Sequence, residues 1–311
     1  MVPGKYGFNR ERGVSAIPVT AVESPRRPHG WPGGWRPGVL AVALVVALPV
    51  LTVFGFFLQP ATEAWRHLAQ TALHDYVGNS LLLMLGVAAG TLLFGVSTAW
   101  VSATCEFPGR RMFEWALLLP MAIPAYIIAY TYTGLLDFAG PVQGALRELF
   151  GWGYGDYWFP NIRSLPGAIA MLSLVLYPYV YLLARAAFLE QSVCVLEVSR
   201  TLGATPMHTF VRVALPMARP AIVAGLLLAL METLADYGTV QFFGVSTFTT
   251  GIFRTWFGLG DAAAAAQLSA LLMSFVFVLI LLERWSRRQA RYHETGARVQ
   301  SLPRHRLEGW R

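Results

Sequence analysis

Long apolar runs alternate with shorter polar segments along this chain. The runs long enough to cross a bilayer cover residues 37 to 59, 79 to 103, 115 to 136, 165 to 186, 220 to 241 and 263 to 282. An apolar helix of about 20 residues, at about 1.5 Å rise each, spans the hydrocarbon core. Most of these runs contain no charged residue, which argues against buried helices of a soluble protein. The pattern predicts an all-α integral membrane protein with six transmembrane helices.

The composition and the charges agree with this topology. Hydrophobic residues make up 55% of the chain and charged residues 13%. Twenty of the 24 Lys and Arg residues fall on one side of the predicted membrane. Because positively charged loops stay in the cytoplasm, we expect a multi-pass protein of the cell (inner) membrane with both termini cytoplasmic. The net charge of +7 then reflects topology, and we expect no nucleic-acid partner.

The chain divides into four predicted parts. Residues 1–36, rich in Pro, Gly and Arg, form a disordered cytoplasmic leader whose last arginines can contact membrane lipid. Residues 37–59 form the first transmembrane helix, and residues 75–284 form a compact unit with the other five. Residues 285–311 form a basic cytoplasmic tail. Both cysteines, Cys105 and Cys194, fall in cytoplasmic connections, so we expect no structural disulfide.

Glycines and prolines predict how the helices pack and bend. Gly86, Gly90 and Gly95 in the second apolar run allow close approach of a partner helix. The prolines of the third and fourth runs predict kinks, and they are Pro120, Pro124 and Pro178. Such kinks can serve gating, but Pro is also common in membrane helices without that role.

Two connections on the predicted outer side carry short structural signals. Pro141 can open a helix within the long connection 137 to 164. Its apolar face would lie on the membrane or against neighbouring spans, and it comprises Val142, Leu146, Leu149 and Phe150. Asp261 is placed to cap the start of the sixth apolar run.

The segment from 196 to 220, which we call the elbow, is polar and lies between two apolar runs. Gly203 can end a helix that runs through Glu197 by a left-handed turn. Thr205 and Pro206 then offer an N-cap and a first helical position. The elbow is therefore predicted as helix, turn and helix on the cytoplasmic side, which is more order than a simple connector needs.

These residues resemble the cytoplasmic loop of permease subunits in binding-protein-dependent ABC importers of the type I fold. That family's pattern is Glu-Ala-Ala, three residues, Gly, nine residues and Ile-x-Leu-Pro. The matching residues here are Glu197, Gly203, Leu215 and Pro216. The departures are Val198 and Ser199 where the family has alanines, and Val213 where it has Ile.

The resemblance implies that this loop, residues 190–219, is a coupling helix that docks on a dimeric ATP-hydrolysing subunit. The implied ATPase-coupling residues are Glu197, Arg200, Gly203, Ala204, Leu215 and Pro216. For Arg200 a solvated helix face is the alternative. A Walker-type phosphate loop needs a Lys, and the sole Lys of the chain is Lys5. We therefore expect a transporter subunit without catalytic residues or cofactors, powered by a separate ATPase.

A narrower resemblance covers most of residues 75 to 292. The segments LLDFAGPVQ, ETLADYGTVQFFG and TTGIFRTWFGLGDAAAAAQLS look like those of iron(III) importer permeases, with thiamine permeases as near relatives. Those permeases usually fuse two six-span halves, and SLPRHRLEGWR looks like the linker before a second half. The implied partners are a solute-binding protein and a second permease half, self or separate. The alternative is that the chain is a truncated or split product.

Two acids lie deep in the fifth apolar run. Glu232 and Asp236 are one helical turn apart and therefore on one face. A cation pathway is one interpretation, and hydrogen bonding to a neighbouring helix is the other. No His lies in any run, and no metal-ligand cluster is expected. An integral membrane enzyme or a passive channel is the alternative from another class, but neither explains the elbow.

Overall fold

The structure is a computed structural model, and it describes residues 35–60, 62–153, 155–191, 199, 201, 203–289 and 305–306. Most of the leader, most of the basic tail and Cys194 lie outside these residues. The chain divides into two units, Met1–Val50 and Leu51–Arg311. In the first unit the described residues are the apolar helix α1, which begins at Trp35 and continues into the second unit as far as Gly55.

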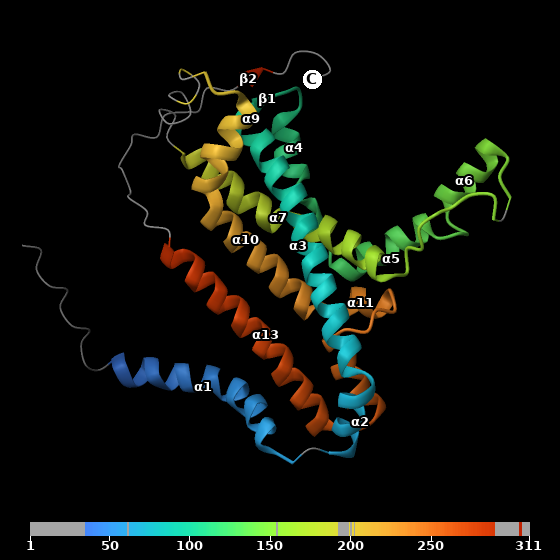
Figure 1. Cartoon of the computed structure of the whole chain (residues 1–311), viewed down its shortest axis with the longest axis vertical. Helices are drawn as coiled ribbons and strands as arrows, with labels where there is room; N and C mark the ends of the chain where they lie inside the picture. The colour runs from blue at the N-terminus through green and yellow to red at the C-terminus, as the bar shows by residue number, and fades with distance from the viewer. Residues whose placement is uncertain are drawn as a thin grey trace, which may run out of the picture. The chain divides into compact units, whose positions relative to one another are not determined.

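The second unit is helical almost throughout (Figure 1). Its longer helices are α2 (Glu63–Thr71), α3 (Leu73–Thr104), α4 (Arg110–Ala116), α5 (Ala125–Leu136), α6 (Pro141–Phe150), α7 (Leu165–Glu190), α10 (Leu215–Ala235) and α13 (Ala262–Gln289). Its shorter helices and turns are η1 (Phe56–Leu58), η2 (Leu119–Ala122), α9 (Pro206–Thr209), η3 (Phe210–Ala214), α11 (Gly238–Phe242), α12 (Phe248–Phe253) and η4 (Arg254–Gly258). Two short strands, β1 (Cys105–Glu106) and β2 (His305–Arg306), pair in parallel.

Five of the described helical segments are long and apolar enough to cross a membrane. They are Pro37–Leu58, Leu73–Thr104, Leu165–Glu190, Pro206–Ala235 and Ala262–Arg284. A sixth span results if two bent segments, Arg110–Ala122 and Ala125–Phe150, are counted as one. The prediction of six spans thus holds only with this broken segment included.

Helices α3 and α7 make the closest helix contact of the unit, and its physical cause is glycine. A Cβ at Gly90 would lie 2.6 Å from the Cβ of Ser173, and one at Gly86 would overlap Ile169. A Cβ at Gly95 would lie 2.9 Å from the carbonyl oxygen of Tyr177. Side chains of α7 fill the space at Gly86 and Gly90, and the α7 backbone itself does so at Gly95, so a partner helix approaches closely at all three glycines, as predicted.

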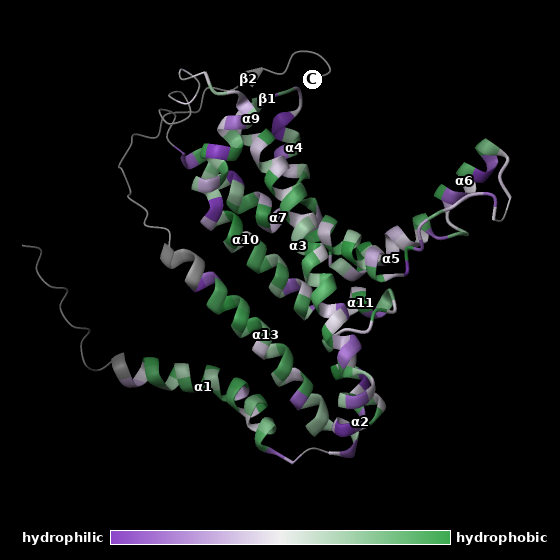
Figure 2. Ribbon diagram, in the orientation of Figure 1, coloured by the Kyte–Doolittle hydropathy of each residue, from purple (hydrophilic) through white to green (hydrophobic). Residues whose placement is uncertain are grey.

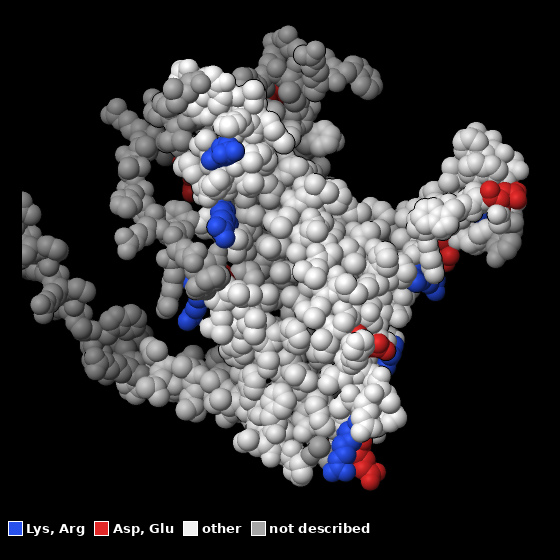
Figure 3. All heavy atoms as spheres, in the orientation of Figure 1, with Lys and Arg blue, Asp and Glu red and all other residues white. Residues whose placement is uncertain are grey.

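Helix α10 packs on α7, and α13 packs in turn on α10. A Cβ at Gly225 of α10 would meet the carbonyl oxygen of Tyr179 at 2.7 Å, so α10 also touches the α7 backbone. Helix α13 packs on α10 through an apolar cluster that includes Leu230 and Leu279. Figure 2 shows the apolar colour along α3, α10 and α13, with polar residues toward their ends. On the face drawn in Figure 3, a broad area between those ends carries no charged side chain.

The third apolar run is not one continuous helix. Its two halves are bent by 100° relative to each other, at a break that follows Pro120 and includes Pro124. Proline cannot donate the backbone hydrogen bond and clashes with the preceding turn, which explains the break. The Tyr177 hydroxyl of α7 donates to the carbonyl oxygen of Leu117 at 2.9 Å and satisfies one freed acceptor. By contrast, α7 continues as one helix through Pro178.

Beyond the break, α5 packs on the core beside α7 with Ala129 fully buried, whereas α6 and the connection after it form an arm that extends away from α3 and α7 (Figure 1). Helix α6 begins at Pro141 as predicted. Its apolar face is exposed rather than packed on neighbouring spans, and Leu149 keeps 77% of its area exposed. The arm is fixed internally, because the Tyr157 hydroxyl donates to the Gln143 side chain at 2.7 Å and Arg147 donates to Tyr157 at 3.0 Å.

The predicted cap of the last span is confirmed. The Ala264 amide donates to Asp261 Oδ1 at 2.9 Å, at the start of α13. This backbone hydrogen bond holds the pKa of the Asp261 carboxyl below its usual range. Asp261 therefore stays ionised next to the positive end of the helix dipole.

Gly90→Ala is expected to destabilise the protein by about 1 to 3 kcal/mol, because the added methyl group overpacks the α3–α7 contact. The measurement is the free energy of unfolding in mixed detergent micelles. Gly78→Ala in the same helix is the matched control, since no atom lies within 4 Å of its Cβ position. Adding Ser173→Gly to Gly90→Ala should restore stability. Equal stability of the two alanine variants would contradict the close contact.

Candidate functional site

The structure describes four of the six predicted coupling residues. Gly203, Ala204, Leu215 and Pro216 are described, whereas Glu197 and Arg200 lie outside the described residues. The described part of the elbow is at the end of α3 that also carries α4 (Figure 1).

The turn of the elbow has the predicted geometry. Gly203 has a φ of 82°, which is the left-handed conformation that favours glycine. The Ala204 amide donates to the Ser199 carbonyl oxygen at 3.1 Å. This is the six-to-one bond of a Schellman motif, so the carbonyl of the preceding helical turn is satisfied within the elbow.

The second arm of the elbow begins with a capped helix, and a wider helical turn follows before α10. Thr205 caps α9, because its hydroxyl accepts from the His208 amide at 3.3 Å. Residues Phe210–Ala214 then form a π-helical turn, in which the Leu215 amide donates to Phe210. Pro216 follows directly and would clash with the carbonyl four residues earlier in a regular helix. A wider turn relieves that clash, so Pro216 explains why the π-helical turn lies directly before α10.

Leu215 and Pro216 have different surroundings. Leu215 packs against the apolar cluster that α3, α7 and α10 share, whereas Pro216 is exposed. Their side chains thus cannot both belong to one contact surface. Leu215 anchors the arm, and Pro216 sets its shape.

The outer face of the elbow exposes apolar side chains. Met207 is 69% exposed and Val211, one turn later, is 45% exposed. The helical segment Pro206–Ala235 has 30 residues, about 45 Å at about 1.5 Å each, so one end projects from a hydrocarbon core of about 30 Å. His208 and Arg212, both exposed, mark the elbow end as the projecting one. An apolar patch outside the lipid is typical of a protein-binding surface.

Sequence reasoning missed the residues that hold the elbow in place. Ser199, a departure from the family pattern, pairs its hydroxyl with that of Thr209 at 2.9 Å across the two arms. Gln191 at the end of α7 donates to the carbonyl oxygen of Ala214 at 2.8 Å. Neither bond has a local sequence signal, because the partners are 10 and 23 residues apart.

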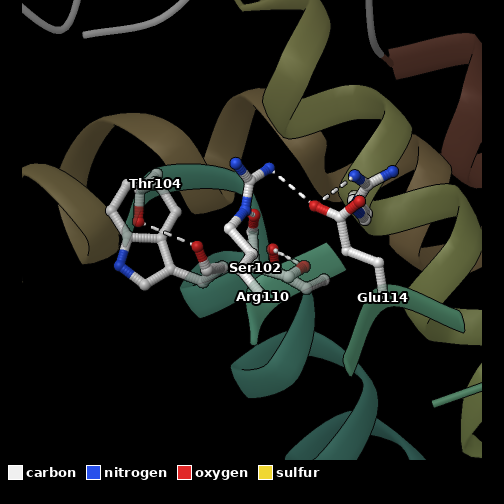
Figure 4. A network of polar contacts seen from close by, with 7 residues as sticks. Ser102, Thr104, Arg110 and Glu114 are labelled. Carbon is white, nitrogen blue, oxygen red and sulfur yellow. Dashed lines mark hydrogen bonds and ion pairs between the residues drawn. The ribbon is translucent and has the colours of Figure 1, made fainter. Parts of the chain in front are cut away.

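A second polar group, the Glu114 clamp, lies at the same end of α3 (Figure 4). One oxygen of Glu114 accepts from Arg110 at 2.7 Å and from Arg185 of α7 at 2.9 Å. Arg110 Nε also donates to the Ser102 carbonyl oxygen at 2.8 Å. All three charged side chains are at least three-quarters buried. The clamp therefore joins the last turn of α3 to α4 and to α7.

The two acids of the fifth apolar run lie at the end of α10 and have different surroundings. Helix α10 ends at Ala235, and Asp236 has extended backbone angles. Its carboxylate accepts from the Thr239 hydroxyl at 3.0 Å and the Val240 amide at 3.1 Å, at the start of α11. Glu232 stays on α10 with an exposed side chain. The Asp236 amide donates to the Glu232 carbonyl oxygen at 3.0 Å, so the two acids lie one helical turn apart, and their shared face stays a prediction.

Comparisons with known proteins show which family and which relatives this chain resembles. The family model described as "Binding-protein-dependent transport system inner membrane component" matches residues 91–292. The chain is 28% identical over 275 residues to the Fe(3+)-transport system permease protein FbpB 2 of Haemophilus influenzae. This match covers 86% of the chain but 48% of that relative, so the chain spans about half its length.

A shorter relative is matched over nearly its full length. The molybdenum transport system permease protein ModB of Escherichia coli strain K12 is 25% identical over 229 residues, which are 70% of this chain and 97% of ModB. Among solved structures, a bacterial alginate ABC transporter in complex with a periplasmic protein gives a TM-score of 0.65. At 17% identity over 82% of this chain and 93% of that one, this likeness shows the fold.

Replacing Glu114 by Gln is expected to lower the free energy of unfolding by about 1.5 to 3 kcal/mol, because two mostly buried arginines lose a charged acceptor. Denaturant titration of the purified protein measures the change. Glu148→Gln, an exposed position on α6, is the matched control and should be neutral. An equal response at both positions would contradict the clamp.

Proposed function

The chain belongs to the family of binding-protein-dependent transport system inner membrane components, and we propose that its elbow is the surface on which an ATP-hydrolysing subunit docks. As a permease of this family, the chain is a transport component and not an enzyme. The hydrolysis that powers it then takes place in a separate subunit, which docks as a dimer. Movement of that dimer reaches the spans through the elbow and exposes a central path to the two sides in turn.

The observation that carries this proposal is the ordered shape of the elbow. A left-handed glycine, a capped turn and a π-helical turn fix its backbone, and the Ser199–Thr209 bond joins its arms. Its outer face nevertheless leaves Met207 and Val211 uncovered. A rigid segment with an apolar outer face is suited to a protein partner, because little entropy is lost when it binds.

We place the elbow and both termini in the cytoplasm. The support is the distribution of Lys and Arg, of which twenty fall on the elbow side. An ATPase that uses cytoplasmic nucleotide then meets Glu197, Arg200, Gly203 and Ala204 at the elbow. A solute-binding protein meets the opposite end, and a second permease half, self or separate, completes the path.

Ferric iron is the cargo that we propose first. The support is the similarity to FbpB 2 over 86% of this chain, together with the three iron-permease-like segments. Molybdate is the second candidate, since ModB is matched over 97% of its length. A cation and an oxyanion make opposite demands on Glu232, because a carboxylate attracts the first and repels the second.

Docking at the elbow predicts that Gly203→Val abolishes copurification with the ATPase subunit. Valine in the left-handed conformation costs about 1 to 2 kcal/mol and would distort the turn that presents the outer face. Gly155→Val is the matched control, because Gly155 also has a positive φ, 90°, but lies in the α6–α7 connection. A pull-down from detergent-solubilised membranes measures the association. Retained association in the Gly203 variant, with a folded chain, would sink the docking assignment.

The two cargo candidates separate in an uptake experiment on proteoliposomes that contain the full complex. With ⁵⁵Fe(III) as the probe, Glu232→Gln should lower uptake about tenfold, as expected when one favourable charge interaction is removed from a path. With [⁹⁹Mo]molybdate, the same variant should transport at least as well as the parent. Asp236→Asn is expected to weaken the cap of α11, which a lower Tm would report. Unchanged iron uptake by a folded Glu232→Gln variant would exclude this acid from a cation path.

A further inference from the structure

The loop between Gln191 and Ala214 is closed at its base by one buried hydrogen bond. Gln191 is 7% exposed and Ala214 is fully buried, and the side chain of the first donates to the carbonyl oxygen of the second at 2.8 Å. The bond therefore joins the end of α7, where the chain leaves the helical bundle, to the last residue of the π-helical turn, where it returns. A buried amide that lost this acceptor would be left with an unsatisfied donor.

Three aromatic rings pack beside this bond. Trp100 of α3 meets Phe188 of α7 edge-on, with 5.3 Å between ring centroids. The same indole meets Phe210, the first residue of the π-helical turn, at 4.9 Å. Trp100 thus touches both stems of the loop at once. We call Trp100, Phe188, Gln191, Phe210 and Ala214 the base junction.

The base junction also connects to the Glu114 clamp through two residues of α3. The Trp100 carbonyl oxygen accepts from the Thr104 hydroxyl at 2.8 Å, and Ser102 accepts from Arg110. Figure 4 shows this end of α3 beside Arg110 and Glu114. The last turn of α3 itself links the base junction to Arg110, and Arg110 pairs with Glu114 on α4, which opens the broken span. Coupling between distant sites is carried by such contiguous packed and hydrogen-bonded groups.

We propose that the base junction makes the elbow move as one body with α3, α7 and the broken span, so that Trp100 and Gln191 are positioning residues for energy coupling. This inference rests on the proposed docking of an ATPase at the elbow. Without the base junction, the π-helical turn is the point where the elbow would bend relative to α10, because hydrogen bonds are less regular in a wide turn than in an α-helix. The junction braces this turn from the side of α3 and α7.

A merely structural role and a coupling role differ in what they change. Loss of folding lowers ATP hydrolysis, ATPase association and uptake together. Loss of rigid coupling leaves association and hydrolysis in place and lowers the amount of solute moved per ATP hydrolysed. The ratio of uptake to hydrolysis therefore isolates the proposed role.

The test uses the full complex in proteoliposomes with ⁵⁵Fe(III) or [⁹⁹Mo]molybdate, whichever the parent complex takes up. Trp100→Leu and Gln191→Met should keep ATPase association and hydrolysis within about twofold of the parent, and should lower uptake per ATP about tenfold, within the range of measured coupling effects. Trp100→Phe should recover most of the ratio, because it restores an aromatic contact. Trp115→Leu and Gln70→Met, both at exposed positions, are the matched controls.

An unchanged ratio in Trp100→Leu would overturn the proposal. Loss of the ATPase subunit from that variant would overturn it too, because the residue would then belong to docking. If the parent complex holds no ATPase or moves neither probe, the proposed function fails separately, and hydrogen exchange of the purified chain in nanodiscs decides the junction. Exchange in residues 206–214 should become about tenfold faster in Gln191→Met and Trp100→Leu, with α13 unchanged. Equal exchange in parent and variants would refute the junction.

Discussion

The close contact between α3 and α7 is the constraint on which the rest of this structure depends. In a bilayer the lipid is as apolar as the helix surface, so helices associate through packing and polar contacts rather than through the hydrophobic effect. Gly86, Gly90 and Gly95 remove the side chains that would hold the two backbones apart. The pair then offers a fixed surface to α10, which approaches α7 through a glycine of its own, Gly225. Helix α13 in turn packs on α10, so both helices take their positions from this pair.

The end of the molecule that carries the elbow is built on the same pair of helices. Trp100 stands at the end of α3 and Phe188 at the end of α7, and their distance is set by the glycine contact farther along the helices. Phe210 closes this aromatic group from the elbow. On the other side of α3, Glu114 draws Arg110 and Arg185 together and ties the broken span to the pair. A motion imposed at the elbow thus meets a packed junction and not a loose loop.

How much of the fold and of the elbow could be predicted depends on how far apart in the sequence the interacting residues lie. Gly203, Thr205, Pro141 and Asp261 act within one helical turn, so their residue types alone predicted a left-handed turn, two helix starts and a cap. The small residues of α3 predicted close packing but not its partner. Gln191 with Ala214, and Tyr177 with Leu117, join residues 23 and 60 apart, and no local pattern marks either pair. The helical period places Glu232 and Asp236 one turn apart, but it does not show that α10 ends at Ala235.

Polar groups explain why these long-range bonds lie where the regular helices end. Backbone groups at membrane depth need protein partners, since lipid offers none. Prolines at 120, 124 and 216 each interrupt a helical ladder. Near Pro120 the Tyr177 hydroxyl donates to the carbonyl oxygen of Leu117. In the π-helical turn that precedes Pro216, the Gln191 side-chain amide donates to the carbonyl oxygen of Ala214. Both donors come from α7, the helix that α3 holds most tightly. Helix α7 and its C-cap therefore support both irregular segments, which explains why a helix held by close packing lies next to each of them.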